Sequence, residues 1–394
     1  MLACDPHPVK LHIAEVHRVP RSGDPCYRRS VDPLYARVLA FIADAAADHF
    51  EPLALAVFRH QFERSLPYQR FCLSRGATPE TVADWQAIPA VPIMAFKRAE
   101  LCCGPPQRVF RSSGTTAGID ARSRHLLTEP RLYHRSALAG LRRCLFPDLE
   151  RLRIVSLIAP VEALPESSLA QMVAWALDEF GAADSRYVAA AAGLDVAALI
   201  EMLRASEGDG QPLAILTTTG GLIRVLDALT ARELAFRLPH GSRLMDTGGD
   251  KGAPRRLSPK GLLHAVWQAF AIPGYFCVNE YGMAELSSQY YDSVIADRAR
   301  GRHAPRRKLA PHWARATVLD PISLAPQPPG APGLLRHVDL ANAGSALAVL
   351  SEDMAVAVED GFQLLGRAPG AETRGCSLTA AAWAPSATAQ SLPA

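Results

Sequence analysis

Lysine is scarce in this 394-residue sequence, although Lys and Arg together number 42 against 39 Asp and Glu residues. The basic residues are therefore nearly all arginines, and the lysines are confined to Lys10, Lys97, Lys251, Lys260 and Lys308. The resulting net charge of +3 is too small to indicate a nucleic-acid partner. A catalytic lysine, if the chemistry needs one, has to come from one of these five positions.

The sequence also lacks the patterns of a zinc centre, an export signal and a membrane span. Its 8 cysteines form no CxxC pair and no Cys/His ligand spacing. The first residues, MLACDPHPVKLH, contain no apolar stretch of the kind that signal peptides have. No apolar run approaches the ~20 residues needed to cross a bilayer. We expect a cytoplasmic protein with reduced thiols.

The distribution of apolar residues predicts an α/β fold. Apolar residues recur at helical spacing from about residue 33 to 75. Between residues 111 and 295, apolar strands alternate with amphipathic helices, which predicts a mostly parallel sheet covered by helices on both faces. Farther on the strands shorten, and Asp360-Gly361 between two β runs predicts a hairpin.

We divide the chain accordingly into four regions. They are an N-terminal arm and helical region (1–110), an α/β core (111–295), a small C-terminal β subdomain (296–378) and a disordered tail (379–394). The basic stretch 296–312 is either a solvated surface loop or a loop that faces phosphate.

A Ser/Thr/Gly string stands at the start of the core, at residues 112–118 (SSGTTAG). Small hydroxyl residues around glycine allow backbone N–H groups to approach an anion closely, and a polyphosphate is the natural ligand. The alternative is an ordinary surface turn. No GK[ST] follows the string, so it is not a Walker loop.

Two further signals follow. The first, NEYGMAE at residues 279–285, ends a predicted strand, where ligands of open α/β sheets collect. There Tyr281 could stack on a base and Glu285 could hold Mg²⁺, or both could be structural. The second is Asp353, which follows a predicted strand and could accept both hydroxyls of a ribose, or belong to a plain turn.

In this order and spacing, the three signals resemble the adenylate-forming superfamily of acyl-CoA synthetases, adenylation domains and luciferases. Within it, the sequence is most similar to the LuxE-type acyl-protein synthetases. The shared phrases include IPAVPIMAFK (88–97), SRH (123–125), MDTGGDKG (245–252), VNEYGMAELSSQYYD (278–292) and DGFQLLGRAPGAETRGCSL (360–378). The resemblance implies the large-domain fold of this superfamily, with the α/β core binding the nucleotide.

The resemblance also implies roles for individual residues. The phosphates of ATP would lie against Ser112, Ser113, Gly114, Thr115 and Thr116. The adenine and acyl side would be lined by Thr247, Gly248 and Gly249, with Tyr281 stacked on adenine, Asp353 on the ribose and Glu285 on Mg²⁺. The remaining predicted nucleotide-site residues are Asn279, Gly282 and Arg367.

The family's reaction joins a carboxylate to the α-phosphate of ATP, which gives an acyl-adenylate and pyrophosphate. The acyl group then passes to a cysteine of the protein and on to a partner acyl reductase. Cys376 matches the position of that cysteine, and the guanidinium of Arg374 would favour its thiolate form. The carboxylic acid itself, fatty or aromatic, is not indicated by the sequence.

The sequence departs from the superfamily pattern in several places. Ala284 and Ala117 stand where a threonine and a glycine are usual, and the usual phosphate-loop lysine is absent, so Arg122, Arg124 or His125 would supply the positive charge. Larger members end in a small mobile domain with a catalytic lysine, which we expect to be missing here; Lys97 or Lys251 would take its place. Two alternatives therefore stay open: a ligase that releases the adenylate or makes a CoA thioester, and a non-catalytic nucleotide-binding scaffold.

Overall fold

Three helices open the part of the chain that the computed structural model describes, which comprises residues 31–112, 122–248 and 255–368. They confirm the helical spacing predicted for residues 33–75. The helices are α1 (Pro33–Ala43), α2 (Phe50–Arg64), α3 (Leu66–Leu73), α4 (Ala95–Arg98), α5 (Pro130–Cys144), α6 (Ser168–Phe180), α7 (Val196–Asp209), α8 (Thr219–Thr230), α9 (Pro259–Phe270) and α10 (Val294–Ala299). Short 3₁₀ turns lie at Trp85–Ala87, Gly274–Phe276 and Leu340–Asn342.

One 12-stranded sheet runs through the molecule in the order β13-β14-β15-β16-β12-β11-β10-β9-β8-β4-β5, with β1 paired to β15. Its strands are β1 (Val91–Pro92), β4 (Arg153–Ser156), β5 (Arg186–Tyr187), β8 (Leu213–Thr218), β9 (Arg243–Thr247), β10 (Cys277–Tyr281), β11 (Tyr290–Asp292), β12 (Lys308–Leu309), β13 (Ala314–Leu319), β14 (Pro332–Asp339), β15 (Ala348–Val358) and β16 (Gly361–Arg367). Two small hairpins lie apart from it: β2 (Arg108–Arg111) with β3 (Arg124–Leu127), and β6 (Ala189–Ala190) with β7 (Gly193–Leu194).

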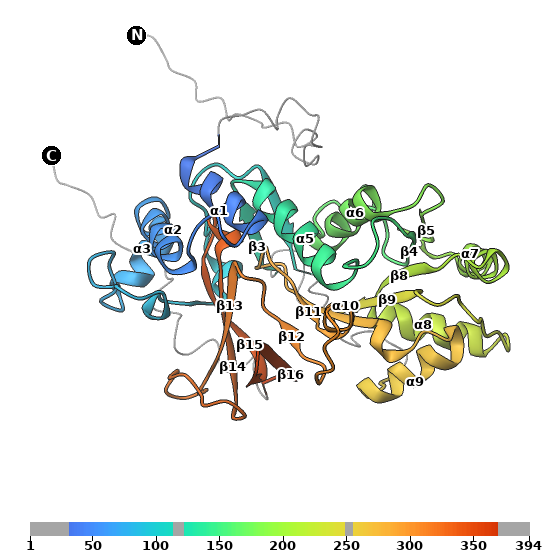
Figure 1. Cartoon of the computed structure of the whole chain (residues 1–394). Helices are drawn as coiled ribbons and strands as arrows, with labels where there is room; N and C mark the ends of the chain where they lie inside the picture. Colours follow the sequence, from blue (N-terminus) through green and yellow to red (C-terminus); the bar gives the residue numbers. More distant parts are fainter. Residues whose placement is uncertain (1–30, 113–121, 249–254, 369–394) are drawn as a thin grey trace, which may run out of the picture.

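The half of the sheet formed by β5, β4, β8, β9 and β10 is parallel throughout. Helices α5 and α6 lie on one side of it and α8 and α9 on the other (Figure 1). Local signals in the sequence define these helices. The Ser167 hydroxyl caps α6 by accepting a 3.1 Å hydrogen bond from the backbone N–H of Ala170, and Ser258 caps α9 in the same way. This half confirms the predicted α/β fold class.

The other half of the main sheet, from β10 through β13, is antiparallel apart from the short pairing of β1 with β15. The predicted hairpin is present as β15–β16, and its two-residue turn contains Asp360 at φ 62°. Gly361 follows because a Cβ there would overlap the backbone oxygen of Lys308 on the neighbouring strand β12. The region boundaries at residues 110, 295 and 378 stay predictions.

Two stretches differ from their expected local structure. The two prolines of stretch 88–96 favour an extended chain, but only Val91–Pro92 pair as a strand, and α4 begins at Ala95. The basic stretch 296–312 contains the end of α10 and the strand β12 as well as loop. In both cases tertiary packing sets the element, since neither stretch has a hydrophobic period of its own.

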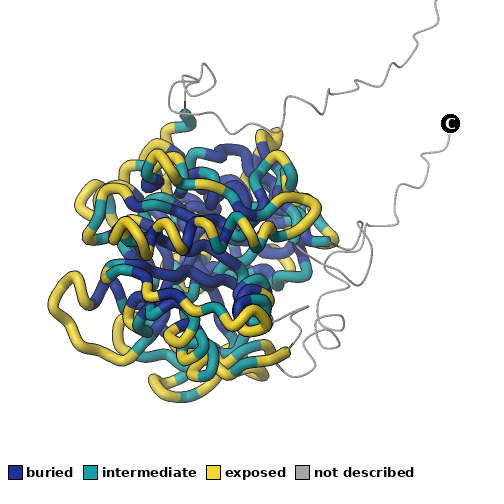
Figure 2. The backbone as a smooth tube through the Cα atoms, turned by 90° about the vertical axis from the view of Figure 1, so that its right-hand side faces the viewer, coloured by how far each residue is buried: buried dark blue, intermediate teal, exposed yellow. Residues whose placement is uncertain are grey.

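Two hydrophobic cores hold the fold together. One lies around the parallel strands and α5–α9, and the other joins α1–α3 to β13–β16. Figure 2 shows the buried backbone running through the middle of the molecule, with exposed segments at the outside. In the three described ranges, no helix is long and apolar enough to cross a membrane.

Candidate active site

The predicted phosphate-binding string begins at Ser112, directly after β2, and β3 follows it along the chain. The backbone N–H of Ser112 donates to the carbonyl oxygen of Ser123 (3.1 Å), and the N–H of Ser123 donates to the hydroxyl oxygen of Ser112 (3.0 Å). These two bonds hold together the chain positions on either side of the string. The other predicted members, Ser113, Gly114, Thr115 and Thr116, lie outside the described residues.

Tyr281, predicted to stack on adenine, ends β10 with its side chain mostly buried. Only 8% of the residue is exposed, and its ring contacts Phe362 edge-on at 5.9 Å between centroids. Its hydroxyl donates a 2.8 Å hydrogen bond to Oδ2 of Asp353 on β15. Burial and the Asp353 carboxylate raise the pKa of Tyr281, so the hydroxyl stays protonated and fixes the predicted ribose acid.

Asp353 and Arg367 face each other in the β15–β16 register. The Arg367 side chain is exposed and lies 3.9 Å from a carboxylate oxygen of Glu352. The hairpin therefore places the two predicted nucleotide contacts at one end, opposite its turn. The hydrogen bond from Tyr281 brings the end of β10 to the same place.

Glu285, the predicted Mg²⁺ ligand, is buried, and burial raises the pKa of its carboxyl group. The Ser123 hydroxyl and the charges of Lys97 on α4 and Arg367 on β16 oppose that shift. These effects place Glu285 within reach of three other segments of the predicted site. No ion pair of Glu285 occurs within residues 31–112, 122–248 and 255–368, so a bound cation would supply the missing counter-charge. A single carboxylate completed by phosphate oxygens is a usual setting for Mg²⁺.

His125 corrects one expectation, because it cannot supply the positive charge that the missing phosphate-loop lysine would carry. Its Nδ1 bonds the carbonyl oxygen of Ala284 at 2.8 Å, which requires the proton on Nδ1. Burial lowers the pKa of His125 to about 4, so the ring is neutral at pH 7. The two candidate arginines are paired with acids: Arg124 lies 3.3 Å from Glu100, and Arg122 pairs with Glu166 at 3.5 Å.

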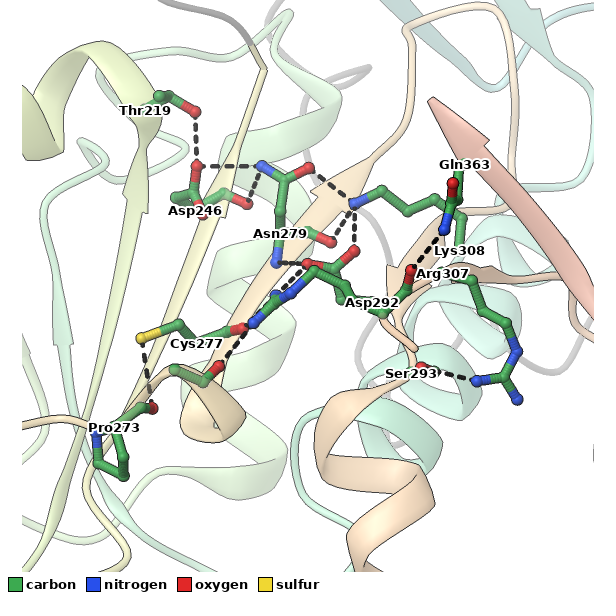
Figure 3. A network of polar contacts seen from close by, with 12 residues as sticks. Thr219, Asp246, Pro273, Cys277, Asn279, Asp292, Ser293, Arg307, Lys308 and Gln363 are labelled. Atoms are coloured by element: carbon green, nitrogen blue, oxygen red, sulfur yellow. Dashed lines mark hydrogen bonds and ion pairs between the residues drawn. The ribbon is translucent and has the colours of Figure 1, made fainter. Parts of the chain in front are cut away.

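Asn279, predicted to contact the nucleotide, lies in a polar network at the boundary between the two halves of the sheet (Figure 3). Its amide nitrogen donates to Oδ2 of Asp246 (3.0 Å), and its Oδ1 accepts from Nζ of Lys308 (2.7 Å). Lys308 also pairs with Asp292 at 3.0 Å, with both side chains nearly buried. Asp246 accepts a further hydrogen bond from the Thr219 hydroxyl at 2.6 Å.

Thr247, predicted to line the pocket, donates through its hydroxyl to Glu280, a residue that sequence reasoning missed. Burial raises the pKa of Glu280 to about 7. Gly282 follows two residues later, and a Cβ there would overlap the Glu280 carboxylate unless that side chain moved. Gly248 adopts φ 74°, and Gly249 lies outside the described residues. An acid at a buried strand position was the signal that could have identified Glu280.

The predicted acyl acceptor Cys376 and its neighbour Arg374 also lie outside the described residues. Of the cysteines that are described, four are buried and Cys102 is partly exposed. Burial raises the pKa of every one, to about 12 for Cys277 and in the same direction for Cys102. Thiols of this kind are poor nucleophiles at neutral pH.

Comparisons with solved structures show the fold of adenylate-forming ligases. A 2-hydroxyisobutyryl-CoA ligase, in an open conformation with 2-HIB-AMP and CoA, aligns with a TM-score of 0.59 at 16% identity over 82% of this chain and 70% of that one. The same ligase in its thioesterification state gives 0.60 at 15% identity over 89% and 73%. ATP-bound MatB from Rhodopseudomonas palustris gives 0.45 at 14% identity over 67% and 49%.

Among curated proteins, no sequence matches the chain. The family described as acyl-protein synthetase, LuxE, matches residues 31–382. This match covers both cores, the hairpin that carries Asp353 and the position of Cys376. The chain therefore belongs to the LuxE acyl-protein synthetase family and is a ligase.

Proposed function

We propose that this protein uses ATP to activate a carboxylic acid as its acyl-adenylate and then transfers the acyl group to Cys376. The observation that carries the proposal is the convergence on Glu285. Its carboxyl group is influenced by Ser123 beside the phosphate string, by Lys97 on α4 and by Arg367 on the hairpin. Polar or charged groups from three separate motifs of the family pattern thus act on one buried acid.

In this proposal Asp353 binds the ribose hydroxyls, while the Tyr281 hydroxyl keeps its carboxylate in place through their 2.8 Å hydrogen bond. Glu285 would hold Mg²⁺, and the ion would neutralise charge on the phosphates of ATP. The Ser112 end of the phosphate string lies near Glu285, because Ser112 is hydrogen-bonded to the backbone of Ser123. Ser112, the member of the string that the structure describes, is therefore connected through Ser123 to the predicted metal ligand.

The first step forms a bond between a carboxylate oxygen of the acid and the α-phosphorus and breaks the bond to pyrophosphate. Negative charge accumulates on the phosphate oxygens as this happens, so nearby cations stabilise the transition state. Lys97 is exposed at the end of α4, and its charge acts on Glu285. It is the residue that we assign to this role, together with Arg367.

In the second step the Cys376 thiolate attacks the acyl carbon, a thioester bond forms and AMP departs with the bonding electron pair. The thiol proton leaves beforehand, and Arg374 would favour this ionisation. The described cysteines support the choice indirectly, since burial raises the pKa of each. A partner acyl reductase in the cytoplasm would then take the acyl group from the thioester.

The test separates the two steps. Wild type and Cys376→Ser are assayed for exchange of pyrophosphate into ATP with a panel of fatty and aromatic acids, and for acyl-enzyme by intact mass. A serine hydroxyl stays protonated and is weakly nucleophilic, so Cys376→Ser should exchange pyrophosphate without acylation. Cys102→Ser, which changes the partly exposed described thiol, is the matched control and should behave as wild type.

Each other outcome points to a different activity. Acylation of Cys376→Ser at the wild-type level removes Cys376 as the carrier. Exchange with no acylated cysteine in the wild type replaces the proposal with a ligase that releases its adenylate or acylates CoA. Absence of exchange with every acid, while ATP still binds, leaves a nucleotide-binding scaffold.

A further inference from the structure

A charged cavity of about 530 Å³ lies between α5, the chain after α10 and the start of β13. Five arginines line it together with two aspartates, Asp297 and Asp360. The described arginines come from α5, from the C-cap of α10 and the basic stretch after it, and from β13: Arg143, Arg300, Arg302, Arg307 and Arg315. Segments far apart in the sequence thus contribute arginines to the lining of one cavity.

Two of these arginines are neutralised within the fold. Arg307 pairs with Asp297 at 2.7 Å, and each of these side chains is only 5% exposed. Arg302 pairs with Asp360 in the hairpin turn at 2.9 Å. The aspartates therefore fix the positions of these two guanidinium groups and compensate their charge.

The other three arginines have no carboxylate partner within the described residues. Arg143 donates to the carbonyl oxygen of Ala310 at 3.0 Å, and Arg315 donates to that of His312 at 2.8 Å. Arg315 also lies 4.0 Å from the centre of the Phe50 ring, and burial lowers its pKa. Arg300 is exposed at the end of α10. Among the described residues of the lining, three positive charges are therefore not compensated by carboxylates.

We propose that this cavity binds a small metabolite carrying at least two phosphate groups. Its volume is within the range of small-molecule sites, roughly 300–1,000 Å³. Guanidinium groups bind phosphate through paired N–H···O bonds and keep their charge when partly buried, unlike lysine. The concave shape favours a small ligand over an acidic protein segment, which would need a larger and flatter surface.

The cavity is separate from the proposed nucleotide site. Asp360 lies in the turn of the hairpin, whereas Asp353 lies at its other end, five residues before Val358, the last residue of β15. At about 3.3 Å per residue, the strand alone separates the two ends by roughly 17 Å. The proposal therefore goes beyond the acyl-transfer function and does not depend on it.

The experiment measures binding of fructose 1,6-bisphosphate to the full chain by calorimetry at two salt concentrations, with glucose 6-phosphate and a poly-glutamate peptide as comparison ligands. Fructose 1,6-bisphosphate should bind more tightly than the other two. Arg300→Ala should weaken it at least ten-fold, Arg143→Ala should do the same, and Arg300→Lys should recover part of the loss.

The matched control is Arg298→Ala, on the same helix, since Arg298 is exposed and lies over the Tyr275 ring at 4.3 Å, outside the cavity. Arg298→Ala and Asp353→Ala should both leave bisphosphate binding unchanged. The proposal is overturned if fructose 1,6-bisphosphate does not bind, if binding follows Asp353 instead of Arg300, or if the acidic peptide binds more tightly. Absence of binding would show that the arginines form a structural ion-pair network. Binding that depends on Asp353 would show a single nucleotide site, and tighter binding of the peptide would show a protein-docking surface.

Discussion

The Tyr281 hydroxyl donates to Asp353 although three strands, β11, β12 and β16, separate β10 from β15 in the order of the sheet. Such a bond requires the sheet to curl, so that the end of its parallel half meets the open end of the hairpin. The Tyr281 ring also contacts Phe362 of the hairpin, which supports the same closure. The candidate active site therefore lies where the two halves of one sheet come together.

This closure predicts that Asp353 and Tyr281 affect ATP binding differently. In wild type, ATP with Mg²⁺ should raise the melting temperature, since ligand at 100 times its dissociation constant stabilises by about 2.7 kcal/mol. Asp353→Ala should abolish the rise, because the ribose loses its acceptor. Tyr281→Phe removes one hydrogen bond to a carboxylate, which costs about 1.5–3 kcal/mol of stability, so the melting temperature without ligand should be lower. Most of the increase caused by ATP with Mg²⁺ should remain. A full rise in Asp353→Ala would remove Asp353 from the site.

Restoring the family hydroxyl at residue 284 should increase turnover. Ala284 is only partly buried, and its carbonyl oxygen already binds His125, so its side-chain position is free to change without loss of that bond. Ala284→Thr adds a donor worth about 1.5–3 kcal/mol if it reaches a phosphate oxygen. A bond made only in the transition state raises the rate of pyrophosphate exchange and leaves ATP affinity unchanged. Ala284→Ser is the smaller control, and a loss of rate in both variants would mean that the pocket is adapted to alanine.

Glu280 should make the stability of the protein fall as the pH rises. Its pKa increases from 4.5 to about 7 on folding because of burial, so between these values the native state binds more protons than the unfolded state. The free energy of unfolding therefore decreases from about pH 4.5 to 7, by an amount on the order of 3 kcal/mol at most. Glu280→Gln should remove this decrease.

The measurement is urea unfolding of wild type and Glu280→Gln at pH 5, 6, 7 and 8. The stability gained by the variant should grow with pH and level off above pH 7. Asp339, whose pKa is also raised by burial, titrates in both proteins and cancels from the difference. The exposed Glu63→Gln should show no such trend. A constant difference between the two proteins at all four pH values would contradict a raised pKa for Glu280.

The buried ion pair of Lys308 and Asp292 should be sensitive to which partner is removed. Asp292 serves two cations, Lys308 at 3.0 Å and Arg306, and also accepts from the backbone N–H of Asn279 at 2.9 Å. Asp292→Asn should cost about 3–5 kcal/mol, because Lys308 keeps its charge in a nearly buried position without an anion. Lys308→Met should cost less, since Asp292 retains Arg306.

Both variants are compared with wild type by urea unfolding, after circular dichroism confirms that they fold. The double variant Lys308→Met/Asp292→Asn should be more stable than Asp292→Asn alone, since it contains no unpaired lysine. Equal losses for the two single variants would show that Arg306 does not share the charge of Asp292.

Much of the parallel half could be predicted from the sequence because its signals are local. The start of α6 at Ser168 follows from the Ser167 cap, and the start of α9 follows from Ser258 and Pro259. Apolar strands such as β8 read as continuous hydrophobic runs because helices cover both faces. The short strand β12 has no apolar run, because it lies in a basic stretch of the sequence. The burial of Lys308 in this strand could therefore not be predicted.

The sequence by itself determined the family, since its motifs require only particular residues in a particular order. It did not determine the ionisation and partners of those residues. His125 is neutral because it is buried, with its Nδ1 bonded to the carbonyl oxygen of Ala284. The side chain of Asn279 is hydrogen-bonded to Lys308 and Asp246, which lie on other strands. Burial and contact depend on segments that are distant in the chain, so only the tertiary structure decided them.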